Sequence, residues 1–354
     1  MAFRILALSG GGYLGLYSVR LLARLEAVAG RPIAQSFDLI CGASAGAIAA
    51  LALSLEIPAA DIERVFVEHG PSIFPQIKGP FHEMKRSVAF LHSLLRPKYS
   101  DQVLRKAIAS LIGEDKTLAS ALHRVVLPVV NMTTGQIEVI KTPHLADWTH
   151  HADFSMTEVG VAAAAAPTYF PMAEINNSLY VDGAIFANAP DLVGVHEGEY
   201  YLEQPSETIE VLSIGTTTGS FSLPYSHGRD YGSARWLRGG RLFATITSAQ
   251  QQMTQVFLRH HLGERYLRID SPRASGNEMD LAFDGATPHG TKTILSLADH
   301  AFEEAMKRSG VVEMLRSTAP AATFYPGLGG AGRRLNGQAP RALGPPPGAD
   351  AHPR

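Results

Sequence analysis

The first 55 residues contain two turns of small residues, and each turn lies between an apolar run and a helix-like pattern. Residues 3–8 form the first apolar run, and the glycine-rich stretch 9–15 follows it before leucine and valine recur at helical spacing. Residues 37–41 form the second apolar run, which leads into the small residues 42–46 and then a helical pattern over 47–55. The chain therefore begins with two strand–turn–helix units, which is typical of an α/β fold.

The second turn, Gly42-Ala43-Ser44-Ala45-Gly46, has the spacing of a nucleophile elbow. A reactive serine between a strand and a helix takes a strained backbone conformation, and only small neighbours leave its hydroxyl exposed. The helix that follows directs its N-terminal amides towards the same place, which favours a developing oxyanion. Ser44 is therefore a candidate nucleophile.

The first turn supplies candidate amide donors for that oxyanion. Because glycine has no Cβ, the amides of Gly11 and Gly12 can closely approach a tetrahedral intermediate. Gly10-x-Gly12-x-x-Gly15 also fits a dinucleotide-binding fingerprint, but that motif expects an acid at the end of the second strand, whereas Asp38 stands at its start. A P-loop is excluded because no Gly-Lys-Ser/Thr follows the glycines.

A serine hydroxyl needs a base, and the best candidate lies far downstream. The α/β-hydrolase order of serine, acid and histidine fits poorly, because only one clear strand precedes the strand that leads to Ser44. In Tyr180-Val181-Asp182-Gly183-Ala184 an apolar strand ends in an acid followed by two small residues. Asp182 then stands at the carboxyl edge of a sheet, where open α/β folds place their sites.

Taken together, the glycine run, the Ser44 elbow and the Asp182-Gly183-Ala184 motif resemble the patatin-like phospholipases, which use a Ser–Asp dyad without histidine. The resemblance extends over about residues 4–220. Three further segments carry it: Ala162–Pro171, Asn188-Ala189-Pro190 and Val211–Thr216.

The resemblance implies a fold, a reaction and residue roles. The fold is a three-layer α/β/α sandwich with a C-terminal helical extension. The reaction is hydrolysis of acyl esters of membrane phospholipids through an acyl-Ser44 intermediate, with Asp182 as base and neither metal nor organic cofactor. The oxyanion motif corresponds to four glycines: Gly10, Gly11, Gly12 and Gly15.

The glycine loop departs from the family pattern at one point. The family usually has Arg or Lys between the third and fourth glycine, whereas this chain has Tyr13 and Leu14. The backbone amides and the helix dipole are then left to hold the oxyanion, which points to slow turnover or a need for activation.

Composition limits the partners and the compartment. The 354-residue chain has a net charge of −2, which argues against general nucleic-acid binding. Its single cysteine, Cys41, lies in the second predicted strand and is expected to be a core residue, and one cysteine suits a reducing compartment. The start lacks the pattern of a signal peptide and no run of about 18 apolar residues occurs, so we expect a cytoplasmic protein that contacts the inner membrane peripherally.

Residues 71–98 interleave aromatic and aliphatic residues with lysine and arginine. This pattern suits an interfacial segment or a lid over an acyl pocket, and it also suits an ordinary helix packed on the sheet. The 14 histidines are scattered, and the pairs His150-His151 and His260-His261 are expected to diverge on solvated surfaces without sharing a metal.

The second half predicts helices over 241–262 and 291–315, with several cationic residues between 235 and 268. Some stand-alone bacterial patatin-like lipases of this size resemble effectors of cyclic-oligonucleotide antiviral signalling. In such a protein the cations could pair with a signalling phosphate and order the active site. These cations are Arg235, Arg238, Arg241, Arg259, His260, Arg265 and Arg268.

The expected organisation is a patatin-like catalytic domain over 1–220, a helical extension over 221–325 and a disordered Gly/Pro-rich tail over 326–354. Three functions remain open at this point. They are a phospholipase switched on by a cyclic dinucleotide, a constitutive lipase or esterase, and a non-catalytic sensor on the same scaffold. A homo-oligomer is compatible with each of them.

Overall fold

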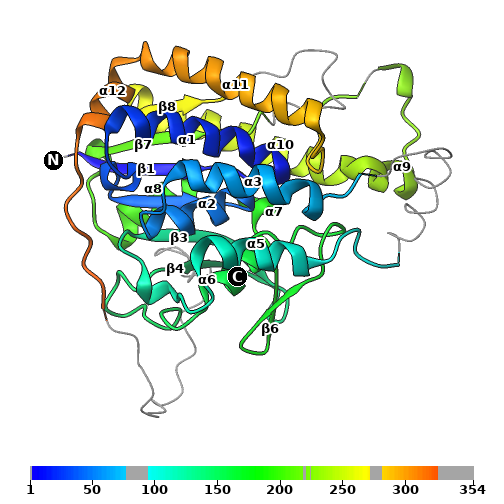
Figure 1. Ribbon diagram of the computed structural model, residues 1–354, viewed down its shortest axis with the longest axis horizontal. Coiled ribbons are helices and arrows are strands. Elements are labelled where there is room, and N and C mark those ends of the chain that lie inside the picture. The colour runs from blue at the N-terminus through cyan, green and yellow to red at the C-terminus, as the bar shows by residue number, and fades with distance from the viewer. Residues whose placement is uncertain (1, 77–94, 218–220, 224, 272–280, 326–354) are drawn as a thin grey trace, which may run out of the picture.

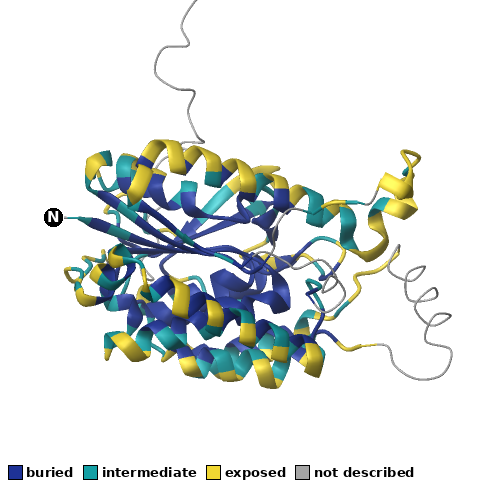
Figure 2. Cartoon of the chain, turned by 90° about the horizontal axis from the view of Figure 1, so that it is seen from above, coloured by how far each residue is buried: buried dark blue, intermediate teal, exposed yellow. Residues whose placement is uncertain are grey.

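The computed structural model describes residues 2–76, 95–217, 221–223, 225–271 and 281–325. They form a mixed eight-stranded sheet between two layers of helices (Figures 1 and 2), the α/β/α sandwich expected from the sequence. The strand order is β5-β6-β3-β2-β1-β7-β8, and β4 pairs with β3. The strands are β1 (Phe3–Leu8), β2 (Leu39–Gly42), β3 (Val125–Asn131), β4 (Gln136–Lys141), β5 (Ala173–Ile175), β6 (Ser178–Asp182), β7 (Ile209–Ile214) and β8 (Tyr266–Ile269).

The centre of the sheet is parallel and is buried on both faces. β1 pairs in parallel with β2 and β7, and the parallel pairing continues from β2 to β3 and from β7 to β8. This burial explains why β1 and β7 are largely continuous apolar runs without strand-like alternation. The remaining pairs, β3–β4, β3–β6 and β5–β6, are antiparallel.

Two apolar cores, one on each face of the sheet, hold the layers together. The larger core contains residues of α1 (Gly15–Ala29), α2 (Ala45–Ser54), α3 (Ala59–Ile73), α5 (Asp101–Ile112), α6 (Met156–Ala163), α11 (Pro288–Met306) and α12 (Ser309–Arg316). The smaller core packs the opposite face against α8 (Asp191–His196) and α10 (Arg241–Leu262). Two short helices, α7 (Ala184–Ala187) and α9 (Ser233–Leu237), complete the set in the described residues.

The segment expected to be a helical extension also contributes a strand to the sheet. β8 pairs with β7 from Val211↔Tyr266 to Ile214↔Ile269, and the sequence reasoning did not anticipate it. The helix predicted over 241–262 coincides with α10. The prediction of one helix over 291–315 was wrong, because Arg308 takes an extended backbone between α11 and α12 and donates a hydrogen bond to the carbonyl of Arg268 at 2.7 Å.

Two sequence predictions fall largely on residues outside the described part. The Gly/Pro-rich tail over 326–354 lies there, as do residues 77–94 of the proposed lid or interfacial segment. Among the described residues, no helix has the length and apolarity needed to cross a membrane.

Candidate active site

β2 and β6 bring the candidate nucleophile and base together because both strands pair along one edge of β3. β2 pairs with β3 only as far as Cys41↔Val126, and β6 pairs from Val129↔Asp182 onward, while β4 occupies the other edge. The carboxyl ends of β2 and β6 therefore meet beside residues 127–128. Ser44, two residues after β2, and Asp182, the last residue of β6, lie at this meeting point.

Ser44 has the backbone strain expected of a nucleophile elbow. Its φ is 52° and its ψ is −125°, a region that residues other than glycine rarely adopt. The two flanking glycines allow the close packing of strand and helix, because a Cβ at Gly42 would lie 2.3 Å from the Gly46 carbonyl oxygen and one at Gly46 would lie 2.3 Å from the Leu8 carbonyl oxygen. Ala43 and Ala45 are buried beside them.

Asp182 is a fully buried carboxylate with one unsatisfied oxygen. Its Oδ1 accepts a hydrogen bond from the Ala184 amide at 2.8 Å, across the turn made by Gly183, and its Oδ2 has no partner at hydrogen-bond distance. Burial raises the pKa of Asp182 to about 7, although the nearby Ser44 hydroxyl and the Ala184 amide act to lower it. The carboxyl is therefore poised to exchange a proton near neutral pH.

Of the four glycines of the first turn, two donate their amides to hydrogen bonds within the protein and two do not. The Gly10 amide donates to the Asn188 carbonyl at 2.9 Å, and the Gly15 amide donates to the Gly12 and Tyr13 carbonyls. Within the described residues no acceptor faces the amides of Gly11 or Gly12. These two are thus available to an oxyanion, and the other two shape the loop.

Residues from distant parts of the chain hold this loop in place. The Gly10 carbonyl accepts a hydrogen bond from the Thr216 hydroxyl at 2.7 Å, and its amide is fixed by Asn188. The Tyr13 amide donates to the Phe283 carbonyl at 2.8 Å. Sequence reasoning missed Phe283, because no local motif marks a residue that acts through its backbone carbonyl.

The two residues that replace the usual cation of the loop are buried. Tyr13 and Leu14 are each 1% exposed and belong to the larger core. The Tyr13 hydroxyl lies 2.7 Å from the Thr291 hydroxyl on α11. This position of the loop is therefore part of the packing between the first turn and α11.

A guanidinium reaches the loop from β8 instead. Arg268 donates to the hydroxyl oxygens of Ser9 at 2.9 Å and Ser213 at 2.8 Å, and it pairs with Asp270 at 2.7 Å. Gln251 of α10 donates to the same carboxylate at 3.2 Å. This buried network supports the glycine loop through Ser9. The apolar–polar alternation of residues 266–270 is the sequence signal that could have revealed it.

A cavity that opens to solvent adjoins Ser44 and the glycine loop, and its empty space, open solvent included, is about 590 Å³. Its walls come from α2, α3, α5 and two aromatic loops, and they are almost wholly apolar. It could hold a flexible hydrocarbon chain, with the ester carbonyl at Ser44. The lining residues are Gly12, Tyr13, Ser44, Ala45, Ile48, Val65, Phe66, Gly70, Ile73, Phe74, Leu104, Ala107, Ile108, Leu111, Ala164, Phe170 and Phe283.

The cations grouped together by sequence lie in four different places. Arg235 and Arg241 flank the ring of Tyr231 at the start of α10, and Arg238 lies between them in the chain. Arg265 donates to the carbonyls of Ser206 and Ile209, and Arg268 belongs to the buried network. Arg259 and His260 are exposed at the far end of α10. The seven residues therefore do not form one cluster.

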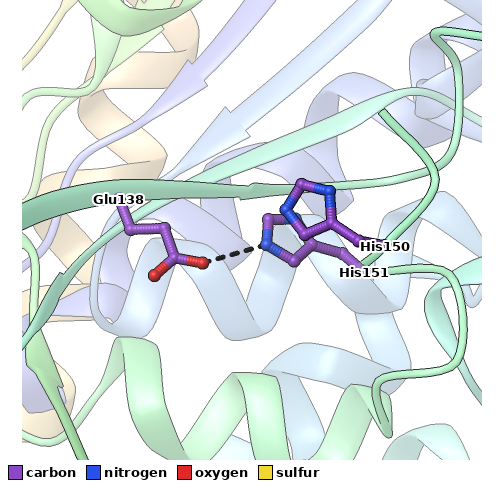
Figure 3. A group of neighbouring side chains, drawn as sticks. All are labelled: Glu138, His150 and His151. Atoms are coloured by element: carbon purple, nitrogen blue, oxygen red, sulfur yellow. Dashed lines mark hydrogen bonds and ion pairs between the residues drawn. The ribbon is translucent and has the colours of Figure 1, made fainter. Parts of the chain in front are cut away.

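Glu138, His150 and His151 form a group that could be considered for a metal, with ligand atoms within 4.8 Å of one another (Figure 3). The expectation that the two histidines diverge was wrong, since their ring centroids are 4.0 Å apart and His151 is buried. Nδ1 of His151 accepts a hydrogen bond from the Lys141 amide at 3.2 Å, so Nε2 carries the proton and faces Glu138 at 3.0 Å. This pattern suits a hydrogen bond and not a metal, because a ligating histidine donates its other N–H.

Comparisons with known proteins find several that are similar to this chain. The family profile for patatin-like phospholipases matches residues 6–192. A Pseudomonas aeruginosa protein named cGAMP-activated phospholipase is 36% identical over 92% of this chain and 95% of its own length. One of the same name from Vibrio cholerae is 30% identical over 89% of this chain and 95% of its own length. The structure of VipD from Legionella pneumophila is similar at a TM-score of 0.38 and 13% identity, covering 84% of this chain and 67% of its own.

Proposed function

The chain belongs to the patatin-like phospholipase family, and from this premise we propose that it hydrolyses membrane phospholipids through Ser44 and Asp182. One observation carries the proposal. The buried Oδ2 of Asp182 has no hydrogen-bond partner, and the Ser44 hydroxyl lies near enough to lower the pKa of that carboxyl. No histidine is needed, because burial raises the pKa of Asp182 to about 7 and so makes it a stronger base than an ordinary aspartate.

In the proposed acylation step, Ser44 Oγ attacks the ester carbonyl while its proton passes to Oδ2 of Asp182. The carbonyl oxygen becomes an oxyanion that the amides of Gly11 and Gly12 stabilise. One such donor typically contributes about 3–4 kcal/mol. The carbon–oxygen bond to the glycerol then breaks, Asp182 returns the proton to the leaving alcohol, and the acyl group stays on Ser44.

In the deacylation step, water takes the place of the alcohol. Asp182 accepts a proton from the attacking water, the acyl–Ser44 bond breaks, and the proton is returned to Ser44 Oγ. The fatty acid leaves through the apolar cavity, whose aliphatic and aromatic walls suit a hydrocarbon chain. The substrate head group is left outside the cavity.

We also propose that a cyclic dinucleotide switches on this activity at the inner membrane, in bacterial antiviral defence. The support is that two relatives, each aligned with this chain over 95% of its own length, are named cGAMP-activated phospholipases. The buried Tyr13 and Leu14 agree with a loop that lacks its own cation and works slowly until activated.

Fatty acid release from phosphatidylglycerol–phosphatidylethanolamine vesicles, with and without cGAMP, tests both parts. We expect release with cGAMP, and a loss of at least about 1000-fold in Ser44→Ala. Ser54→Ala is the matched control, because Ser54 is a buried serine of the helix that follows Ser44 and its hydroxyl donates to the Leu51 carbonyl of that helix. A fluorophosphonate probe should label the wild type and not Ser44→Ala.

The outcomes separate the remaining functions. Full release without any nucleotide would indicate a constitutive lipase and remove the activator from the proposal. Absence of both release and labelling, with cGAMP bound, would indicate a non-catalytic sensor. Full activity in Ser44→Ala would exclude the dyad.

A further inference from the structure

The start of α10 carries a group of arginines and aromatic rings that the proposed reaction does not use. We call Tyr231, Arg235, Trp236, Arg238 and Arg241 the arginine platform. The guanidinium carbons of Arg235 and Arg241 lie 5.5 and 5.8 Å from the centre of the Tyr231 ring. Trp236 meets the same ring edge-on, with centroids 5.4 Å apart. The platform thus places two stacked cations and two aromatic rings within one short segment.

Within the described part of the chain, no carboxylate neutralises the cations of the platform. Among the described residues, none of Arg235, Arg238 and Arg241 forms an ion pair with a carboxylate. Arg20 and Arg24, by contrast, share Asp299 at 2.9 and 2.8 Å. Arg235 and Arg241 instead donate to the backbone carbonyls of Asp230 and Arg235, which keeps their positive charge available. Unpaired arginines that are already positioned favour a ligand with more than one negative charge.

The platform stands at the catalytic end of the molecule. α9 projects from the right-hand end in Figure 1, whereas β1 begins at the left-hand end, so the carboxyl ends of the parallel strands face the platform. Two residues beyond Arg241, Phe243 packs against Tyr169 and Phe283, with ring centroids 6.2 and 5.6 Å apart. Phe283 lines the cavity beside Ser44.

We propose that the arginine platform is the binding site of a cyclic dinucleotide, which rests on the proposed activation of this enzyme. The two phosphates pair with the guanidinium groups of Arg235, Arg238 and Arg241, as planar bidentate donors do in other phosphate sites. A base stacks on Tyr231 or Trp236, because aromatic and guanidinium planes are the usual surfaces for unpaired bases. The platform thus offers groups for both parts of the ligand, the anionic phosphates and the bases.

α10 connects this site to the glycine loop by two routes. In the first, Phe243 packs on Phe283, whose carbonyl accepts the Tyr13 amide at 2.8 Å. A small shift of α10 at the platform therefore acts on the backbone next to Gly12. The contact is direct and needs no movement of the sheet.

The second route uses two consecutive glutamines of α10. The side chain of Gln250 accepts a hydrogen bond from the Ala189 amide at 2.9 Å, and that of Gln251 accepts one from the Asn188 side chain at 3.3 Å. The Asn188 carbonyl in turn holds the Gly10 amide at 2.9 Å. A ligand that fixes the start of α10 thereby fixes both ends of the oxyanion loop, which is the segment that lacks its own cation.

Equilibrium dialysis with cGAMP tests the site directly. We expect the double variant Arg235→Glu/Arg238→Glu to bind cGAMP about 10- to 100-fold more weakly than the wild type, and to need correspondingly more nucleotide for fatty acid release. Arg259→Glu is the control: it reverses one arginine charge on α10, about 27 Å from Arg241 at 1.5 Å per residue, at a position where the described hydrogen bond of the side chain is to Gln255. The control should bind cGAMP as the wild type does. Thermal unfolding of both variants should match the wild type, because these side chains are exposed.

The outcomes distinguish this site from the activation on which it rests. If Arg235→Glu/Arg238→Glu binds cGAMP as tightly as the wild type and is still activated, the platform is not the binding site, and the proposal of activation by cGAMP is unaffected. No binding and no activation of the wild type would overturn the activation, and the site with it. Normal cGAMP binding with lost sedimentation on anionic vesicles would show that the platform contacts lipid, which also overturns the proposal. Weakened binding in Tyr231→Ala, which keeps every charge, would support base stacking.

Discussion

Two carboxylates are buried in different surroundings: Asp182 ends β6, whereas Glu197 follows α8 and contacts Lys141 of β4. Glu197 accepts hydrogen bonds from Lys141 at 2.6 and 2.8 Å and from His144 at 3.1 Å. Burial acts to raise the pKa of Glu197, but His144 and Lys141 outweigh it and leave that pKa below its ordinary value. Asp182 receives one backbone amide and no cation, and its pKa is raised to about 7.

The difference separates a carboxylate that supports the structure from one that is available for chemistry. Around Glu197 every oxygen is satisfied, and the charge is matched by Lys141, whose side chain also lies 4.0 Å from the centre of the Tyr201 ring. Around Asp182 an oxygen is left without a partner beside a strained serine. An unsatisfied buried group lowers the stability of the fold, and folds keep such groups where a reaction needs them.

The strongest test of this contrast is the activity of Asp182→Asn. The amide keeps the shape of the side chain but cannot accept the Ser44 proton, so we expect fatty acid release to fall by at least about 1000-fold. Glu197→Gln, assayed as folded protein, should keep activity within a few-fold, because Glu197 contacts no part of the site. Equal losses in the two variants would mean that Asp182 is not distinct from a structural carboxylate.

The free energy of unfolding should be lowered by Glu197→Gln, the variant expected to keep its activity. Glu197→Gln leaves Lys141 buried without its counter-charge, and we expect the free energy of unfolding to fall by about 3–5 kcal/mol. Urea denaturation measures this change. The control Glu199→Gln removes the nearby, more exposed pair with His261 and should cost less than about 1 kcal/mol. A similar small loss in Glu197→Gln would show that the buried pair contributes little.

These contacts also mark how far the sequence alone could lead. Ser44, Asp182 and the four glycines were predicted because local motifs specify them, each within a strand–turn unit. The partners of Glu197 were not predicted, because Lys141 and His144 lie more than 50 residues away and only the pairing of β3 with β4 places them. The contacts that Phe283 and Arg268 make with the glycine loop, from over 250 residues away, were not predicted for the same reason. The sequence also predicted one helix where Arg308 separates α11 from α12.

Removing the charge of Asp182 should stabilise the fold at high pH. The pKa of Asp182 is raised from 3.8 to about 7, so ionising it in the folded state opposes folding by up to about 4 kcal/mol above pH 7. Asp182→Asn should therefore resist urea better than the wild type at pH 8 by up to this amount. The advantage should disappear as the pH falls towards 3.8, where the wild-type carboxyl is protonated in both states. An advantage that does not depend on pH would point to packing and not to charge.

The smallest expected effect is the pH dependence of the reaction, and it tests whether the same ionisation serves catalysis. The base must be deprotonated to take the Ser44 proton, so kcat/KM for a soluble, uncharged ester should fall about tenfold per pH unit below pH 7 and level off above it. An ordinary aspartate would give a profile that stays flat down to about pH 4. A soluble substrate is needed because vesicle charge also titrates. Because kcat/KM reports ionisation in the free enzyme, a flat profile in an enzyme that Asp182→Asn inactivates would mean that the pKa of Asp182 is not raised there, and the contrast with Glu197 would fail.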